Sequence, residues 1–319
     1  MTGEITVFSG SAHQAFAEEM CQILGVELYH ARTTRFSNDC LQVQLRANCR
    51  QRDVYIVQPL VPPVQENLFE LLLMLDAARG ASAGHITAVI PHFAYARSDK
   101  KDQPRISIGA RLVADMLAAA GATRVLTMAL HAPQVHGFFS VPVDHLSAVL
   151  ELAAHFRRGD LTNTVVVSPD LGNAKVATEF ARNLGLPVAA GSKQRLSDDL
   201  VVIDRIVGDV RGRNVIVLDD EIATAGSIIE LLRVLRKEGA QRISLAATHG
   251  LFTGPAIERL AAEADIVEIV TTNTVPLAPE KHLPNLVTRS VAPLFAEAVH
   301  RIHHGESVSS LFSDRETYG

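Results

Sequence analysis

The chain has 319 residues, 47% of them hydrophobic and 20% charged, a composition that excludes a disordered protein and predicts about two globular domains. Its net charge of −5 disfavours a general nucleic-acid binder, and neither a signal-peptide pattern nor an apolar run of membrane-spanning length is present. Three cysteines without CxxC spacing disfavour a disulfide framework or a zinc site, so we expect a protein of the reducing cytoplasm.

Strand and helix patterns alternate along the chain. Short apolar runs rich in β-branched residues predict strands at residues 5–8, 54–57, 86–91, 125–130, 165–168, 215–218, 243–249 and 266–272. Helical periodicity covers residues 12–25, 67–80, 107–121, 174–185 and 228–239. These helical segments end at glycine, as helix C-termini often do. The alternation predicts an α/β fold with largely parallel sheets.

An internal repeat points to a duplicated domain. GATRVLTMALHA from Gly121 and GAQRISLAATHG from Gly239 align without gaps, and His131 and His249 occupy the same place in each. We therefore predict two α/β domains, residues 1–148 and 149–319, the second with a C-terminal tail. The alternative is chance, because a helix, a glycine and a strand often follow one another in α/β proteins.

The segment VIVLDDEIATAGSIIELL, residues 215–232, has the pattern of a ligand site. Its apolar run predicts a strand covered on both faces, ending at Asp219 and Asp220, where open α/β sheets bind ligands. A loop of small residues then opens a helix: Thr224, Ala225, Gly226 and Ser227. Free N–H groups at such a helix start favour phosphate, and the acids suit ribose hydroxyls or Mg²⁺. Alternatively, the acid pair only caps the helix.

Two further segments have similar chemistry. Arg97, Lys100, Lys101 and Arg105 follow the strand at 86–91 and suit a polyphosphate, although a solvated basic loop is the plain alternative. VVVSPDLGNAK ends a strand near Asp170 and continues through small residues into a helix, a pattern that fits a magnesium-bound phosphate or a sugar.

Two weaker signals complete the candidates. His131 follows a strand and could bind a metal or a nucleotide phosphate, but a single histidine is weak evidence. Lys193 and Arg195 lie on a polar segment that could close over a reacting phosphate, although exposed basic loops usually have no such role.

Taken together, these motifs resemble the ribose-phosphate pyrophosphokinase family nearly end to end. The stretches that carry the resemblance are FSGSAHQ at Phe8, RFSND at Arg35, DVYIVQ at Asp53, YARSDKKDQPR at Tyr95, LVADML at Leu112, LHAPQVHGFF at Leu130, VSPDLGNAK at Val167, LDDEIATAGS at Leu218, THGLFTGPAIERL at Thr248 and HGESVSSLF at His304. The resemblance implies two tandem phosphoribosyltransferase-type domains, each a mainly parallel sheet flanked by helices. It also implies an enzyme that transfers the β,γ-diphosphate of Mg²⁺-bound ATP to the C1 hydroxyl of ribose 5-phosphate, leaving AMP and phosphoribosyl pyrophosphate.

The resemblance also implies a role for each candidate residue. Lys193 and Arg195 would be catalytic, stabilising charge on the transferred phosphoryl group, and His131 and Asp170 would position the metal. The ATP side would comprise Phe36, Asn38, Arg97, Lys100, Asp102 and His131, with Phe36 and Asn38 gripping adenine across a subunit boundary. The ribose 5-phosphate side would comprise Asp170, Asp219, Asp220, Thr224, Ala225, Gly226 and Ser227. A homo-oligomer, usually a hexamer built from dimers, is implied as well.

Several positions depart from the common family pattern. Acids are replaced at Ala129, Ser140, Ala223 and Cys40, while Ala225 and Ser98 replace other common residues. We favour an active synthetase of a divergent subgroup. A non-catalytic partner of a true synthetase is the alternative, and a transferase that consumes phosphoribosyl pyrophosphate is disfavoured because it would need no ATP site. Differences at Pro104, Pro133, His136 and His145 lead us to expect weakened ADP regulation, although Arg50, Arg105 and Ser309 match.

Overall fold

The structure is a computed structural model that describes residues 3–195 and 201–311, with the side chains of residues 193–195, 201–204 and 310 left out. Its elements form two compact units. The first contains the described residues up to Ser147, residues 274–276 and those from Val291 onward, and the second contains residues 148–273 and 277–290. The expected division placed residues 149–319 together, so the return of residues 291–311 to the first unit is a difference from that expectation.

The first unit is built around a six-stranded sheet of order β2-β1-β5-β6-β7-β8 in which all pairs are parallel. The strands are β1 (Ile5–Ser9), β2 (Leu28–Tyr29), β5 (Asp53–Val57), β6 (His85–Ile90), β7 (Arg124–Met128) and β8 (Val143–Leu146). A separate antiparallel hairpin consists of β3 (Ala31–Arg35) and β4 (Leu41–Leu45). The helices are α1 (Gln14–Leu24), α2 (Val64–Gly80), α3 (Gly109–Ala120) and α8 (Ala292–His304), with 3₁₀ turns η1 (Ala94–Arg97), η2 (Pro133–Phe138) and η4 (Ser309–Leu311).

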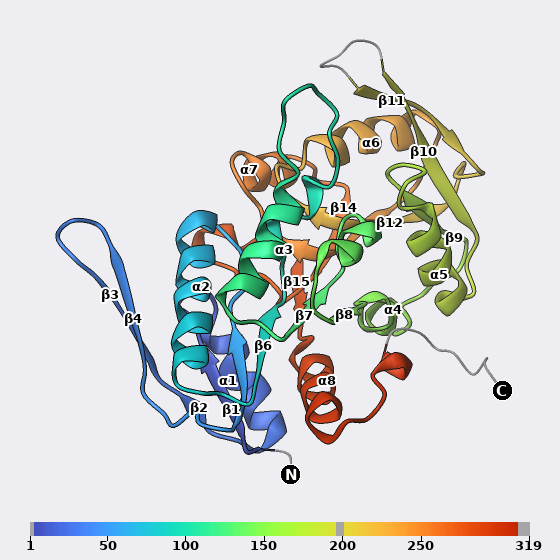
Figure 1. Ribbon diagram of the computed structural model, residues 1–319. Coiled ribbons are helices and arrows are strands. Elements are labelled where there is room, and N and C mark those ends of the chain that lie inside the picture. The colour runs from blue at the N-terminus through green and yellow to red at the C-terminus, as the bar shows by residue number, and fades with distance from the viewer. Residues whose placement is uncertain (1–2, 196–200, 312–319) are drawn as a thin grey trace. The chain divides into compact units, whose positions relative to one another are not determined.

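The second unit has a seven-stranded sheet of order β11-β10-β9-β12-β13-β14-β15, parallel except for the β10–β11 pair. The strands are β9 (Thr164–Ser168), β10 (Val188–Arg195), β11 (Val201–Val207), β12 (Asn214–Ile222), β13 (Ile243–Gly250), β14 (Ile266–Thr272) and β15 (Leu286–Arg289). The helices are α4 (Val149–Phe156), α5 (Ala174–Leu184), α6 (Gly226–Lys237) and α7 (Ala256–Ala261), with the 3₁₀ turn η3 (Pro279–Lys281). Within each unit the helices flank the sheet (Figure 1), and the predicted parallel α/β class is confirmed.

The two sheets share one connectivity. Their parallel parts, β2-β1-β5-β6-β7-β8 and β10-β9-β12-β13-β14-β15, match strand for strand, so β1 corresponds to β9 and β5 to β12. The sequence repeat, however, aligns β7 with β13, whereas β7 corresponds to β14 by position in the sheet. The repeat is therefore offset by one strand. A helix, a glycine and a buried strand also recur within each unit, so this local pattern cannot fix which copies are equivalent.

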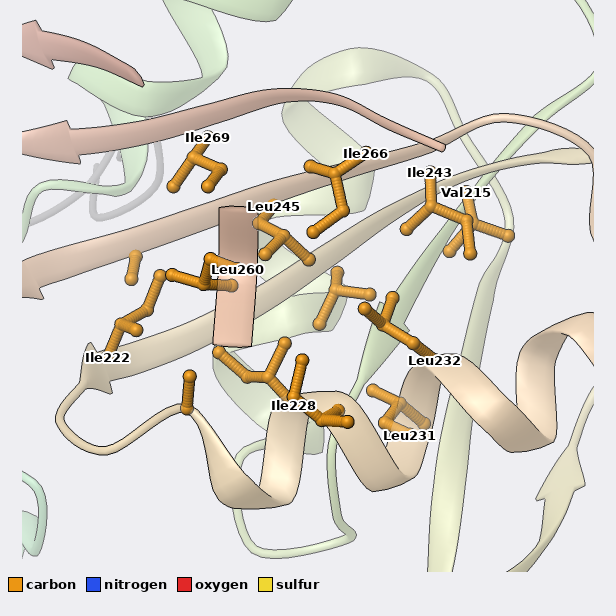
Figure 2. Close-up of a cluster of buried hydrophobic side chains, with 14 of the residues drawn as sticks. Val215, Ile222, Ile228, Leu231, Leu232, Ile243, Leu245, Leu260, Ile266 and Ile269 are labelled. Atoms are coloured by element: carbon orange, nitrogen blue, oxygen red, sulfur yellow. The ribbon is translucent and has the colours of Figure 1, made fainter. Parts of the chain in front are cut away.

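The core of the second unit lies between α6, α7 and one face of the sheet. Ile228, Leu231, Leu232 and Leu235 form the apolar stripe of α6, at the spacing of an amphipathic helix. Figure 2 shows Ile228 and Leu232 of this stripe facing strand residues such as Val215, Ile243 and Leu245. Each fully buried leucine stabilises the fold by roughly 1.5–3 kcal/mol. The packing fixes where α6 begins, and therefore where the loop before it lies.

The last helix belongs to the first unit because its side chains complete that core. Phe295 on α8 packs edge-to-face on Phe16 of α1, with ring centroids 5.3 Å apart. Near the end of α8, His303 Nδ1 lies 2.7 Å from Asp53 Oδ2 at the start of β5. These contacts join the chain's last helix to its first strands, although nothing local in the sequence of α8 specifies which sheet it covers.

Candidate functional site

The acid pair of the second unit lies within a strand rather than after one. β12 continues to Ile222, since Asp219 stays in register with Ala247 and Glu221 with His249 on the parallel neighbour β13. The expectation that the strand stops at Leu218 was wrong. Pairing with a long neighbour extends the ladder through residues whose own β propensity is low. The acids are therefore held on rigid backbone at the carboxyl end of the sheet.

The carboxylates at this strand end repel one another. Burial raises the pKa of Asp219 well above its ordinary value, and the nearby negative charges of Asp220 and Asp170 raise it further. The backbone N–H of Asp220 donates to Asp219 Oδ1 at 2.9 Å, which opposes the shift only in part. The site is thus electrostatically suited to a ligand that brings positive charge or hydroxyl donors.

The loop from Thr224 to Ser227 forms the start of α6. Ala225 has the left-handed φ of 59° and is buried, and no side chain caps the helix. The first N–H groups of a helix lack intrahelical partners and, with the helix dipole, favour an anion. The left-handed conformation is costly for a residue with a Cβ atom, so the loop geometry is held by its surroundings.

Those surroundings include contacts that sequence reasoning missed. The backbone N–H groups of Leu251 and Phe252 donate to the carbonyl of Ile222 at 3.0 Å, and Thr253 N–H donates to Ala223 O at 2.9 Å. Arg259 on α7 donates from Nη1 to the carbonyl of Thr224 at 2.8 Å. THGLFTGPAIERL was noticed only as part of the family resemblance, and no local pattern indicates that Arg259 reaches this loop.

The resemblance assigns the sugar phosphate to this loop, so replacing Arg259 with alanine is expected to raise the KM for ribose 5-phosphate about tenfold and leave the KM for ATP unchanged. A hydrogen bond from a charged donor is worth about 1.5–3 kcal/mol, and its loss frees the loop that is expected to hold the sugar phosphate. Steady-state kinetics with each substrate varied in turn would measure this. Arg233→Ala, which removes an exposed arginine from α6, is the matched control. If Arg259→Ala and Arg233→Ala had the same KM for ribose 5-phosphate, Arg259 would not be the residue that holds this loop in place.

The loop after β9 brings Asp170 to the same strand end. β9 pairs with β12 from Thr164 to Val167, so the two strands finish side by side. Asp170 Oδ1 accepts the backbone N–H of Asn173 at 3.1 Å, and Asn173 donates from Nδ2 to Leu218 O at 3.2 Å. Asp170 lies close enough to raise the pKa of Asp219. The structure therefore brings together Asp170, Asp219 and Asp220, which the resemblance had grouped on the ribose 5-phosphate side.

Lys193 and Arg195 are placed only by their backbone. Both belong to β10, paired with Ile203 and Val201 of the antiparallel β11, and a bulge separates Ser192 from Lys193. Their side chains lie outside the described residues, so their catalytic role stays a prediction. β11 is the edge strand of the second sheet and pairs with β10, the strand that corresponds to β2. In the first unit, β2 is followed in the chain by the separate β3–β4 hairpin.

The basic segment of the first unit is a surface loop. Arg97 ends η1, and Lys100 and Asp102 follow in an exposed stretch before α3. Ser98, which departs from the family pattern, ties this loop to α3, because its Oγ accepts the N–H of Gly109 at 2.9 Å. A Cβ at Gly109 would lie 2.9 Å from that oxygen, so glycine permits the close approach.

His145 holds the turn that carries the exposed His131. Ala129 has the left-handed φ of 45°, and its N–H donates to Leu146 O at 3.0 Å. The next N–H, of Leu130, donates to His145 Nε2 at 2.7 Å. Burial, with the charge of His136 as a smaller cause, lowers the pKa of His145 to about 4. The imidazole is therefore neutral near pH 7 and can accept this bond.

The stability of the protein is expected to fall as the pH drops from about 6.5 to about 4. The folded pKa of His145 lies below the ordinary value of 6.5, so the unfolded chain binds the proton first, at a cost of up to about 3 kcal/mol. Urea unfolding of His145→Asn and wild type at pH 7 and pH 4.5 would isolate this contribution. The exposed His30→Asn is the control. An unchanged pH dependence in His145→Asn would be inconsistent with the assignment.

Phe36 and Asn38 lie at the tip of the β3–β4 hairpin. Phe36 is 48% exposed, and its N–H donates to Cys40 O at 2.9 Å. Asn38 Oδ1 accepts the N–H of Cys40 at 3.3 Å, and Asp39 takes the left-handed φ of 70°. An exposed aromatic residue on a projecting hairpin is available to a ligand or a second chain, as the resemblance implied.

A cavity of about 510 Å³ lies elsewhere, between α4 and the other face of the second sheet. Its lining includes His155, Arg242, Glu268 and Arg289, and none of the predicted site residues. Residues 3–195 and 201–311 contain no group of three His, Cys, Asp or Glu side chains that could hold a metal ion. Within the same ranges, no helix is long and apolar enough to cross a membrane.

Comparisons with known proteins cover both units. Residues 5–121 match the family described as the N-terminal domain of ribose phosphate pyrophosphokinase, and residues 202–313 match the phosphoribosyl synthetase-associated domain. A Streptomyces coelicolor relative is 64% identical, with 98% of each chain covered. The ribose-phosphate pyrophosphokinase of Deinococcus radiodurans is 50% identical over 97% of this chain and 98% of its own. The crystal structure of phosphoribosylpyrophosphate synthetase from Mycobacterium smegmatis has a TM-score of 0.88 at 37% identity, with 95% of this chain and 99% of that chain covered.

Fold and site therefore define a two-domain α/β protein of the phosphoribosyltransferase type, and the predicted tandem architecture is confirmed. Since the identity to Deinococcus radiodurans ribose-phosphate pyrophosphokinase extends over nearly the full length of both proteins, the chain belongs to the ribose-phosphate pyrophosphokinase family and is an enzyme of that family. The resemblance drawn from the sequence is confirmed.

Proposed function

We propose that the protein is a ribose-phosphate diphosphokinase. It transfers the β,γ-diphosphate of Mg²⁺-bound ATP to the C1 hydroxyl of ribose 5-phosphate and releases AMP and phosphoribosyl pyrophosphate. The observation that carries the proposal is the joint placement of an acid pair and an uncapped helix start at one strand end, in a chain so similar to named pyrophosphokinases. One end of that site suits sugar hydroxyls and the other suits a phosphate.

On the ribose side, the 5-phosphate binds the loop from Thr224 to Ser227, where N–H groups and the dipole of α6 converge. Asp219 and Asp220 accept hydrogen bonds from the ribose hydroxyls. The raised pKa of Asp219 reflects its burial and, secondly, the negative charges of Asp220 and Asp170; hydroxyl donors and a nearby cation would stabilise the ionised form. Ala225, although not glycine, already has the backbone conformation that the loop requires.

On the ATP side, Arg97 and Lys100 contact the phosphates, Asp102 and His131 complete the contacts to ATP, and Phe36 and Asn38 hold adenine across a subunit boundary. The exposure of Phe36 and of the basic loop supports these roles. Lys193 and Arg195 stabilise the charge that develops on the β-phosphoryl group, because phosphoryl transfer depends on alignment and electrostatics. No covalent enzyme intermediate is required.

Magnesium fits as an ion that arrives with ATP. The described residues include no three-ligand protein site, but Asp170 and Asp219 supply the oxygen donors that magnesium prefers, and the remaining ligands would be phosphate oxygens and water. His131 and Asp170 would hold the ion, which neutralises phosphate charge when bound. We further propose a homo-oligomer, because the adenine contact requires a second subunit.

A non-catalytic regulatory partner is the second candidate, favoured by alanine at two positions that are acidic in other members. Ala129 keeps an ordered turn and Ala223 accepts a bond from Thr253, so both loops are formed without the acids. The experiment is to supply the purified chain alone with ATP, magnesium and ribose 5-phosphate and to quantify AMP and phosphoribosyl pyrophosphate. Equal amounts of both products support the synthetase, and no turnover across several metals and nucleotides supports the partner.

A further inference from the structure

The first unit contains a strand-end site that corresponds to the ribose site of the second. By position in the sheets, β1 corresponds to β9 and β5 to β12. The loop after β1, with Gly10 and Ser11, thus takes the place of the loop with Asp170. Gln58, the residue after β5, takes the place of Asp219, because Asp53 and Asn214 are the first residues of β5 and β12 that pair with β1 and β9. The second unit carries crowded acids at this place, whereas the first carries polar donors.

These donors surround one carboxylate of the protein itself. Glu70 on α2 is 2% exposed, and its Oε2 accepts the N–H of Ser11 at 3.0 Å, the Ser11 hydroxyl at 2.6 Å and Gln58 Nε2 at 2.6 Å. Its Oε1 accepts the hydroxyl of Thr33. All four partners are donors and none is a cation. The two oxygens of this buried side chain therefore have four hydrogen-bond donors, as buried polar atoms require.

The surrounding backbone is packed tightly around these contacts. A Cβ at Gly10 would lie 2.4 Å from Gln58 Oε1, so only glycine lets the loop after β1 approach that side chain. Gln58 Oε1 also accepts the N–H of Ala12 at 3.1 Å. These contacts hold Gln58 and the loop that carries Ser11 in place next to Glu70.

The fourth partner of Glu70 connects this core to the hairpin. Thr33 is on β3, and β3 and β4 run beside α2 (Figure 1). One turn earlier on α2, Glu66 pairs with Arg35 of the same strand, but both of these side chains are substantially exposed. Thr33 itself is exposed, but its partner Glu70 is buried and the hydrogen bond between them is partly buried. Exposed ion pairs contribute little, so the bond between Glu70 and Thr33 carries more of the attachment than the ion pair does.

We propose that Glu70 is a positioning residue: held by Ser11 and Gln58 at the strand ends of the first unit, it orients the β3–β4 hairpin, and thereby Phe36 and Asn38. The role in ATP binding rests on the proposed function, since it assumes that this hairpin holds adenine. The role of Glu70 in orienting the hairpin does not depend on the proposed function. Thr33 is the residue to change, because Glu70 keeps its three contacts to the core when the threonine hydroxyl is removed.

The first arm of the test measures amide hydrogen exchange of residues 36–45 in the full-length protein without substrate. Thr33→Val is expected to exchange about tenfold faster than wild type, a factor that corresponds to about 1.4 kcal/mol. Thr33→Ser, which keeps the hydroxyl, should restore slow exchange. Thr34→Val, the neighbouring residue on the same strand, is the control and should match wild type. Exchange in Thr33→Val equal to wild type would overturn the proposal.

The second arm measures the KM for each substrate. Thr33→Val should raise the KM for ATP about fivefold, while the KM for ribose 5-phosphate and the melting temperature stay unchanged. A general loss of stability would instead lower the melting temperature and affect both KM values. Faster exchange with an unchanged KM for ATP would refute the link to adenine. Glu70→Gln should act in the same direction and more strongly. If wild type makes no AMP, the proposed function fails, and the exchange arm alone still decides whether Glu70 orients the hairpin.

Discussion

Replacing Lys193 and Arg195 together with alanine is expected to lower kcat for AMP formation by three to four decades and to leave ribose 5-phosphate binding unchanged. Removing one group that stabilises developing charge typically costs about 10²–10³ in kcat, and two groups acting on one phosphoryl group are not fully additive. Single-turnover measurements of AMP formation would isolate the chemical step. The loss is expected in kcat because the contact strengthens as charge moves in the transition state.

The control for this prediction is Arg205→Ala, on the β11 strand that pairs with β10. It removes a positive charge from the same hairpin, next to Ser192 in the register, and should leave kcat within about twofold. If the double variant keeps more than a tenth of wild-type kcat while the control is normal, Lys193 and Arg195 do not carry the chemistry. If both variants lose activity equally, the general charge of the hairpin is responsible.

Asp219→Asn is expected to lower kcat/KM for ribose 5-phosphate about 100-fold and, at neutral pH, to stabilise the free protein. The pKa of Asp219 is raised in the folded state, so ionisation costs more there than in the unfolded chain. Its destabilising effect is absent below the unfolded pKa and grows as the pH rises through the window up to the folded pKa. Asparagine removes that penalty together with the negative charge and one of the two carboxylate oxygens proposed to accept from the sugar hydroxyls, so stability is gained where activity is lost.

Thermal unfolding at pH 4 and pH 7, combined with kinetics, would check this result. The stability gain of Asp219→Asn should be larger at pH 7 than at pH 4. Asp160→Asn removes the same charge before β9, at the opposite end of the sheet, and should leave activity unchanged. Hydrogen bonds from Thr162 lower the pKa of Asp160 and outweigh the smaller raising effect of burial, so no gain is expected there. A loss of stability in Asp219→Asn at pH 7 would contradict the crowding argument.

Local patterns predicted the centre of each sheet and missed its edges. The apolar runs at 5–8, 54–57, 165–168 and 215–218 all form strands, because residues buried on both faces leave an unbroken hydrophobic signal. The edge and hairpin strands, such as ARTTR in β3 and LQVQL in β4, carry no such signal. Their strand conformation comes from pairing with each other.

The sequence by itself determined the α/β class, the central strands and the chemistry of the strand ends, including the acids and the small-residue loop of the second unit. These features are local: periodicity, β-branched runs and loop composition act within a few residues. Only the tertiary structure decided that Asp170 adjoins Asp219, that Arg259 contacts the Thr224 loop, and that Glu70 contacts Ser11 and Gln58 at the strand ends of the first unit. These contacts join segments far apart in the chain. They depend on which strands pair and which faces are buried, and burial is a property of the whole fold.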